Sequence, residues 1–83
     1  MVAKVYGTIR PMNYPRCILK KGKEKPVLGF HPWIFSGAIE SVDEVLQPGD
    51  LTCVESASGA FLGIGYFNPK SKITVRLLAF EMV

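Results

Sequence analysis

Hydrophobic and polar residues alternate with a period of two in several short segments of the chain, and turn residues separate these segments. The alternation is clearest near the C-terminus, where Ile73, Val75 and Leu77 occupy one side of a predicted strand. Extended segments are expected at residues 16–20, 33–35, 38–42, 51–55, 60–68 and 73–80. About five short strands separated by turns predict a closed or nearly closed small barrel.

Proline and glycine mark the connections between these strands. Gln47-Pro48-Gly49-Asp50 has the Pro-Gly centre of a type II turn, in which the glycine position needs a positive φ. The segment 23–30 is expected to contain one or two helical turns, because Pro26 is tolerated near a helix start. The fold class predicted is therefore mainly β with one short helix.

Two glycines interrupt the most regular strand, residues 60–68. Gly63 and Gly65 leave the middle of one strand face without side chains, which predicts sharp curvature or the close approach of another backbone. A dinucleotide-binding loop is the rejected alternative, because a third glycine and a following helix pattern are both missing.

Length and composition limit the chain to one small module. Its 83 residues are 48% hydrophobic and 20% charged, so a folded core is expected and disorder is not. Residues 1–14 are expected to form an N-terminal arm, and residues 15–83 the domain. No stretch is long and apolar enough for a membrane helix, and the N-terminus lacks the apolar core of a secretion signal, so we expect a cytoplasmic protein.

The two cysteines do not form a recognisable metal motif. Cys17 and Cys53 lie far apart in sequence, and His31 is the only histidine. Three such residues do not supply the four ligands of a structural zinc site. We expect buried thiols and no metal site.

Charge is strongly segregated along the chain, although the net charge is only +3. Residues 1–31 carry seven Lys or Arg and one acidic residue, whereas residues 32–69 carry five acidic residues and no Lys or Arg. Lys70, Lys72 and Arg76 follow. If the fold brings the first and last segments together, one face becomes basic and attracts a polyanion; a solvated surface without a partner is the alternative.

The aromatic residues of segment 33–35 have two interpretations. Trp33 and Phe35 share one face of the strand, where they could stack on bases or fill the core. We expect Phe35 in the core, and the two possibilities are balanced for Trp33. Arg76 could meet phosphate or a base edge, or pair with an acid.

Two blocks of sequence resemble the N-terminal PUA domain of the S-adenosylmethionine-dependent methyltransferases that modify cytosine at carbon 5 in large-subunit ribosomal RNA. The first runs from Leu19-Lys-Lys-Gly-Lys-Glu24 through Leu28 to His31-Pro-Trp-Ile-Phe-Ser-Gly-Ala-Ile39. The second is Gly63-x-Gly65-x-x-Asn68-Pro69-x-Ser71-x-Ile73, with Arg76 and Leu78. Together they cover about sixty positions as an ordered pair.

The resemblance implies a PUA-like pseudo-barrel of mixed strands that binds RNA in a groove beside the short helix. The residues implied for this groove are Lys20, Lys21, Lys23, Lys25, His31 and Trp33, and the charge pattern adds Lys70, Lys72 and Arg76. The family's catalytic domain, with its S-adenosylmethionine site and nucleophilic cysteine, is expected beyond Glu81. This chain alone is expected to bind ribosomal RNA without catalysis and without a cofactor.

Two rival functions remain open at this point. One is an independent small-barrel module that binds a peptide or protein, and the other is a minimal enzyme that uses His31 with a cysteine. The sequence also leaves open whether the domain forms a homodimer.

Overall fold

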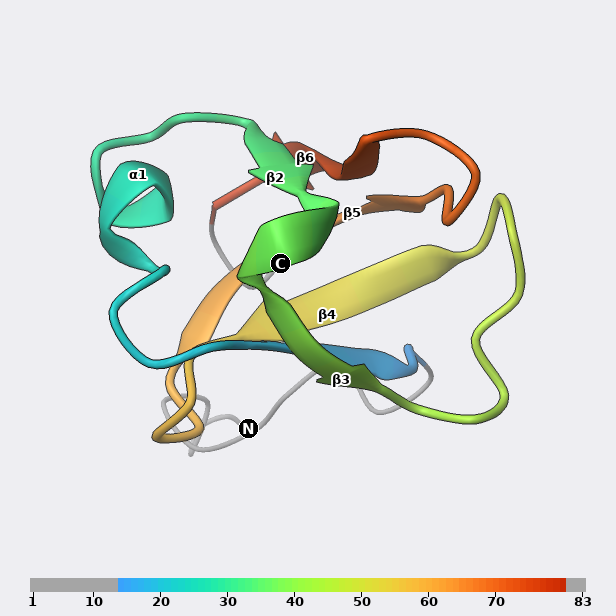
Figure 1. Cartoon of the computed structure of the whole chain (residues 1–83), viewed down its shortest axis with the longest axis horizontal. Coiled ribbons are helices and arrows are strands. Elements are labelled where there is room, and N and C mark those ends of the chain that lie inside the picture. Colours follow the sequence, from blue (N-terminus) through green and yellow to red (C-terminus); the bar gives the residue numbers. More distant parts are fainter. Residues whose placement is uncertain (1–13, 81–83) are drawn as a thin grey trace, which may run out of the picture.

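Six strands form one curled sheet in the part of the chain that the computed structural model describes, residues 14–80 (Figure 1). Their order across the sheet is β2-β6-β5-β4-β1-β3. The parallel pair β1–β4 and four antiparallel pairs make the sheet mixed. The strands are β1 (Arg16–Leu19), β2 (Trp33–Phe35), β3 (Ile39–Val42), β4 (Leu51–Glu55), β5 (Phe61–Phe67) and β6 (Ile73–Ala79).

The sheet curls because its two edge strands are consecutive in the chain. Strands β2 and β3 lie at opposite edges, yet only the 3-10 turn η2 (Ser36–Ala38) separates them. The backbone N–H of Lys20 donates to the carbonyl of Ala38 over 2.9 Å, which joins this connection to the end of β1. The predicted mainly β pseudo-barrel of mixed strands is therefore confirmed (Figure 1).

Gly63 and Gly65 allow β6 to approach β5 closely, as the sequence predicted. A Cβ atom at Gly63 would lie 2.7 Å from the carbonyl oxygen of Ala79, and one at Gly65 would collide with the carbonyl of Arg76. Atoms of the backbone cannot rotate away as a flexible side chain can. These two positions therefore require glycine in the curled sheet.

The local turn predictions hold as well. The N–H of Asp50 donates to the carbonyl of Gln47 over 3.0 Å, and Gly49 has a φ of 90°, as the expected turn requires. The predicted helix is present as α1 (Lys25–Leu28), shorter than the segment 23–30, with Pro26 in its first turn. Of the predicted arm at residues 1–14, only Tyr14 is among the described residues.

The core of the described region lies inside the curl, and one expectation about it is wrong. The side chain of Ile34 is buried, whereas Phe35 is 49% exposed and Trp33 is 45% exposed. Because β2 is a three-residue edge strand, only its middle side chain faces the core. Phe35 is therefore a surface residue rather than a core residue. The buried cluster contains Cys17, Leu19, Val27, Ile34, Leu46, Val54, Leu62, Phe67, Val75 and Leu77.

Both cysteines are buried, as expected. Loss of hydration in the core raises the pKa of the Cys17 thiol to about 12, so this thiol stays protonated at neutral pH. Among residues 14–80, His, Cys, Asp and Glu nowhere gather in a group of three that could hold a metal ion. Over the same residues, no helix is long and apolar enough to cross a membrane.

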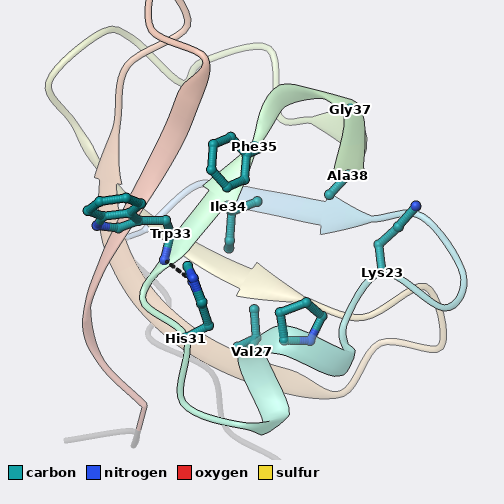
Figure 2. A pocket seen from close by; sticks show the side chains of 9 residues that line it. Lys23, Val27, His31, Trp33, Ile34, Phe35, Gly37 and Ala38 are labelled. Atoms are coloured by element: carbon teal, nitrogen blue, oxygen red, sulfur yellow. Dashed lines mark hydrogen bonds between the residues drawn. The ribbon is translucent and has the colours of Figure 1, made fainter.

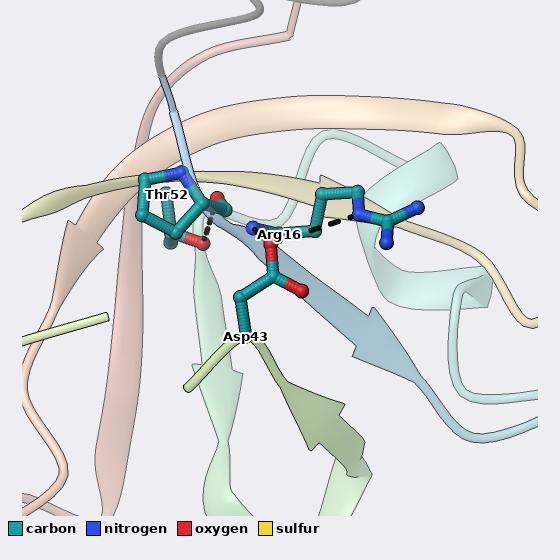
Figure 3. Close-up of polar contacts among 4 residues, drawn as sticks. Arg16, Asp43 and Thr52 are labelled. Atoms are coloured by element: carbon teal, nitrogen blue, oxygen red, sulfur yellow. Dashed lines mark hydrogen bonds and ion pairs between the residues drawn. The ribbon is translucent and has the colours of Figure 1, made fainter. Parts of the chain in front are cut away.

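Asp43 ties the start of β1 to the chain beyond β3 (Figure 3). Its Oδ2 accepts a hydrogen bond from the backbone N–H of Arg16 over 2.8 Å and lies 3.7 Å from the Nε of the same residue. Nearby, the Thr52 hydroxyl donates to the carbonyl of Pro15 over 3.0 Å. The charge of Arg16 is therefore balanced by an acid within the fold.

Candidate nucleic-acid interface

A largely apolar groove of about 420 Å³ lies between α1 and β2 (Figure 2). This volume falls in the range of about 300–1,000 Å³ that is typical of small-molecule sites. Lys23 and His31 are the lining residues with ionisable side chains. The α1–β2 groove is lined by Lys23, Pro26, Val27, His31, Trp33, Ile34, Phe35, Gly37 and Ala38.

The end of α1 directs the chain into this groove through an unusual backbone conformation. Phe30 has a φ of 65°, and its N–H donates to the carbonyl of Val27 over 2.9 Å. The N–H of His31 donates to the carbonyl of Pro26 over 2.9 Å, which completes a Schellman-type helix end. A left-handed conformation costs a non-glycine residue about 1–2 kcal/mol. The Phe30 ring packs edge-on against Phe80, with centroids 5.3 Å apart.

His31 supports the backbone of Trp33. The N–H of Trp33 donates to Nδ1 of His31 over 3.2 Å, and the two rings meet edge to face with centroids 6.0 Å apart (Figure 2). Because Nδ1 is the acceptor, the ring proton of neutral His31 is assigned to Nε2. This hydrogen bond therefore holds the backbone of Trp33 in place where it lines the groove.

Three exposed side chains from three adjacent strands form a row on the outer face of the sheet. Trp33 on β2 pairs with Arg76 on β6, and Arg76 pairs with Tyr66 on β5. The Arg76 guanidinium carbon lies 5.8 Å from the centroid of the Trp33 ring, within cation–π range. We call Trp33, Arg76 and Tyr66 the outer row; Trp33 belongs to both the row and the groove.

Tyr66 is the residue that sequence reasoning missed. Its position in the alternation groups it with Leu62 and Ile64, which are buried, whereas Tyr66 is 51% exposed. The signal that would have found it is its pairing with Arg76, which depends on the β5–β6 register and an irregularity after Ile64. That register is a property of the hairpin rather than of the β5 sequence alone.

The structure places the predicted basic residues in several locations. Lys23 lines the groove, whereas Lys21 lines a separate hollow together with Glu24 and residues 56–58. Lys20 and Lys25 are exposed at the two ends of the connection from β1 to α1.

The basic residues from the C-terminal segment are divided between the β2–β6 edge and the hairpin that joins β5 to β6. The carbonyl of Lys72 accepts a hydrogen bond from the N–H of Ser36 over 3.0 Å, which places the Lys72 backbone beside the end of β2. Lys70 is exposed in the hairpin turn, and Figure 1 shows this turn and α1 on opposite sides of the view. The structure therefore brings together Lys23, His31, Trp33 and Arg76, while Lys70 is not among the residues that line the groove.

Acidic residues are absent from the strands that form the outer row. Strands β2, β5 and β6 contain no Asp or Glu. The acids of segment 32–69 instead belong to β3, to β4 and to the connection between them. A polyanion that approaches the outer row therefore meets Arg76 without an acid on the same strands.

The geometry gives no support to a minimal enzyme based on His31 and a cysteine. Cys17 and Cys53 lie buried on the neighbouring strands β1 and β4, and neither lines the α1–β2 groove. His31 is exposed beside Trp33. A nucleophile and its base must lie within hydrogen-bond reach, and this arrangement does not provide such a pair.

Comparison with protein families and solved structures gives a consistent result. The family model described as "PUA-like domain" matches residues 17–80. The structure is similar to that of a conserved PUA domain protein from Thermoplasma acidophilum, with a TM-score of 0.70 and 23% identity over 81% of this chain and 49% of that chain. At this identity the structural likeness supports the fold alone.

Curated relatives resemble most of the chain but extend far beyond it. Ribosomal RNA large subunit methyltransferase I of Salmonella arizonae is 39% identical over 69 residues, and the protein of the same name from Salmonella paratyphi C is 38% identical over 69 residues. Each match covers 83% of this chain and 17% of the relative. The similar region is therefore a small part of each relative's length.

Proposed function

This chain belongs to the PUA-like domain family, and from that premise we propose that it binds ribosomal RNA and positions a separate methyltransferase domain on it. The observation that carries the proposal is the juxtaposition of the apolar α1–β2 groove with Lys23, His31, Trp33 and Arg76. Aromatic surface for bases next to cationic groups for phosphates is the combination that RNA-binding modules use.

The methyl-transfer chemistry is assigned to the separate domain. S-adenosylmethionine does not fit the glycine pair of this chain, because Gly63 and Gly65 lie within the paired strand β5 and face the backbone of β6. No other glycine-rich loop precedes a helix among residues 14–80. The role of this chain is therefore to bind and orient RNA in the cytoplasm, with the catalytic domain of the full-length protein as its second partner.

The basic side chains divide into two groups in this proposal. Lys20, Lys21, Lys23 and Lys25 lie in α1 or in the connection from β1 that precedes it. Lys23 contacts a phosphate of the RNA in the groove, and the other three contact phosphates outside it. Lys70 and Lys72 lie in the turn between β5 and β6 and act through longer-range attraction, which salt screens more strongly. The two groups offer a matched pair of double substitutions with the same change in charge.

The test is binding of fragmented large-subunit ribosomal RNA, followed by fluorescence anisotropy at several salt concentrations. For the unaltered domain, the logarithm of affinity should fall with the logarithm of salt concentration by about 0.7 to 0.9 per phosphate contacted. Lys20→Ala with Lys23→Ala should weaken binding by about tenfold or more and leave folding intact, because both changes are at the surface.

The control is Lys70→Ala with Lys72→Ala, which should weaken binding less at moderate salt. Unchanged affinity in a folded Lys20→Ala, Lys23→Ala variant would contradict the placement of the interface. Affinity for RNA that does not change with salt concentration would contradict the proposal itself. Independence from salt is what we expect of a groove that binds a peptide.

A further inference from the structure

We propose that the outer row is a stacking surface for an unpaired nucleotide, so that the bound RNA continues from the α1–β2 groove onto the open sheet face. This inference rests on the proposed RNA-binding function and extends it in two respects. It adds Tyr66 to the interface, and it specifies that the RNA at this face is single-stranded.

The pairing of the strands places the three side chains of the row on one face. Trp33 and Arg76 are opposite each other across β2 and β6, and Arg76 and Tyr66 are opposite each other across β6 and β5. Cβ atoms of directly opposed residues in antiparallel strands are about 4.5–5.5 Å apart. The row is therefore continuous, and all three side chains are exposed.

The chemistry of the row suits the flat face of a base. Each base has an aromatic face, so stacking on Tyr or Trp tolerates any sequence, while an arginine beside the ring adds a cation that a nearby phosphate attracts. The contact of Arg76 with the Trp33 ring holds the guanidinium next to the aromatic surface. Leu78, two residues further along β6, is also exposed and extends the apolar part of this surface.

The geometry favours an unpaired nucleotide over a duplex. In an RNA helix the bases stack on one another, so their faces are hidden and side chains meet mainly phosphates and 2′-hydroxyls. A row of aromatic rings gains little from such a surface. The same rings gain from a base in a loop, bulge or single strand, whose face is accessible.

Charge and continuity favour RNA over a protein partner at this face. The strands that carry the row contain Arg76 and no Asp or Glu, so the face is complementary to a polyanion. Trp33 also lines the α1–β2 groove, so one strand of RNA could follow both surfaces without a gap. A protein partner remains a distinguishable outcome of the experiment.

The experiment compares single-stranded RNA of mixed sequence with a perfectly paired hairpin of equal length. Trp33 is the only tryptophan in the 83 residues, so its fluorescence reports RNA that reaches Trp33 from the groove or from the row, and the Tyr66→Ala variant separates the two. Single-stranded RNA should quench this fluorescence, and the hairpin should quench it much less. Tyr66→Ala should lower affinity for single-stranded RNA by about fivefold or more and leave hairpin affinity nearly unchanged.

Two variants serve as matched controls for Tyr66→Ala. Tyr66→Phe keeps the aromatic face and should retain the affinity of the unaltered domain. Val45→Ala shortens a side chain that is 70% exposed outside the row and should not change binding. If Tyr66→Ala proves unstable, Tyr66→Leu takes its place, because it keeps an apolar side chain at this position and removes the aromatic face.

Several results would overturn the inference. Unchanged single-strand affinity in Tyr66→Ala, together with weakened binding in Lys20→Ala, Lys23→Ala, would reject the stacking surface and leave the proposed RNA-binding function standing. Absence of Trp33 quenching by bound single-stranded RNA would reject it too. Loss of self-association in Tyr66→Ala, with RNA affinity intact, would identify the row as a protein interface instead. No RNA binding by the unaltered domain would reject both proposals.

Discussion

Strands β2, β6 and β5 form one half of the sheet, and β4, β1 and β3 form the other. Both halves supply the same core, with Ile34 and Val75 from the first and Cys17 and Val54 from the second. Their outer residues differ. The first half has the outer row and no acid, whereas the second half and its connections carry acids, including Asp43, which balances Arg16.

This difference teaches how a small domain with a net charge of only +3 can present a surface for a polyanion. The sheet order, rather than the total charge, separates cations with aromatic neighbours from acids. The core can be shared because its residues face inward in both halves. Substitutions in the two halves should therefore have different effects on stability and on RNA binding.

The largest effect is expected from Gly65→Ala in the half that carries the outer row. The added Cβ would collide with the Arg76 carbonyl, and this backbone cannot move without changing the β5–β6 pairing. We expect the free energy of unfolding to fall by about 3 kcal/mol, the upper part of the usual range for overpacking. Urea denaturation measures the change.

Gly37→Ala is the matched control for this substitution. A Cβ atom at Gly37 would meet nothing within 4 Å, so the change should stay within about 0.5 kcal/mol. Equal stability of the two variants would show that the close approach of β5 and β6 is not required for the curl of the sheet.

An intermediate effect is expected from alkaline pH, through Cys17 in the other half. Its pKa is about 12 in the folded protein against 9.0 for a thiol in water, because burial disfavours the thiolate. Between these values the unfolded chain releases the proton and the folded chain keeps it. Stability from this group is therefore complete well below pH 9 and decreases by about 1.4 kcal/mol per pH unit above it, so that about 1.4 kcal/mol is lost by pH 10, the highest pH of the comparison.

The measurement compares the pH dependence of unfolding in the unaltered protein and in Cys17→Ala. The difference between the two curves isolates the contribution of Cys17. The variant should be less stable at neutral pH because it loses buried volume, and its stability should fall less steeply above pH 9. Parallel curves would contradict the assigned effect of burial on this thiol.

Sequence patterns predicted local features well in both halves. The turn at Pro48-Gly49, the strands, the short helix and the close approach at Gly63 and Gly65 all depend on neighbouring residues, and the structure contains each of them. Alternation reports which residues share a face. It does not report whether another element covers that face, and for this reason Phe35 was wrongly expected in the core.

The outer row could not be predicted from local sequence patterns either, because its three residues come from three different strands. Trp33, Arg76 and Tyr66 meet only because β6 lies between β2 and β5 in the sheet. Segregated charge along the chain predicted a basic face if the first and last segments converged, but it did not predict that Arg76 would lie beside Trp33. The order and register of strands decide such contacts.

The smallest effect is expected from a comparison of one arginine in each half. Arg76→Gln removes the cation that lies beside the Trp33 ring, and we expect affinity for single-stranded RNA to fall by about fivefold, because the attraction of this cation to a nearby phosphate is lost. Arg16→Gln removes a cation already balanced by Asp43, so affinity should change by less than about twofold.

The two arginine variants carry the same change in net charge, which makes them controls for each other. Arg16→Gln should lower the free energy of unfolding by less than about 1 kcal/mol, because the ion pair is partly exposed and the backbone hydrogen bond to Asp43 remains. Equal losses of RNA affinity would mean that the RNA responds to total charge alone. Unequal losses in the expected direction would assign the interface to the half of the sheet that contains β2, β6 and β5.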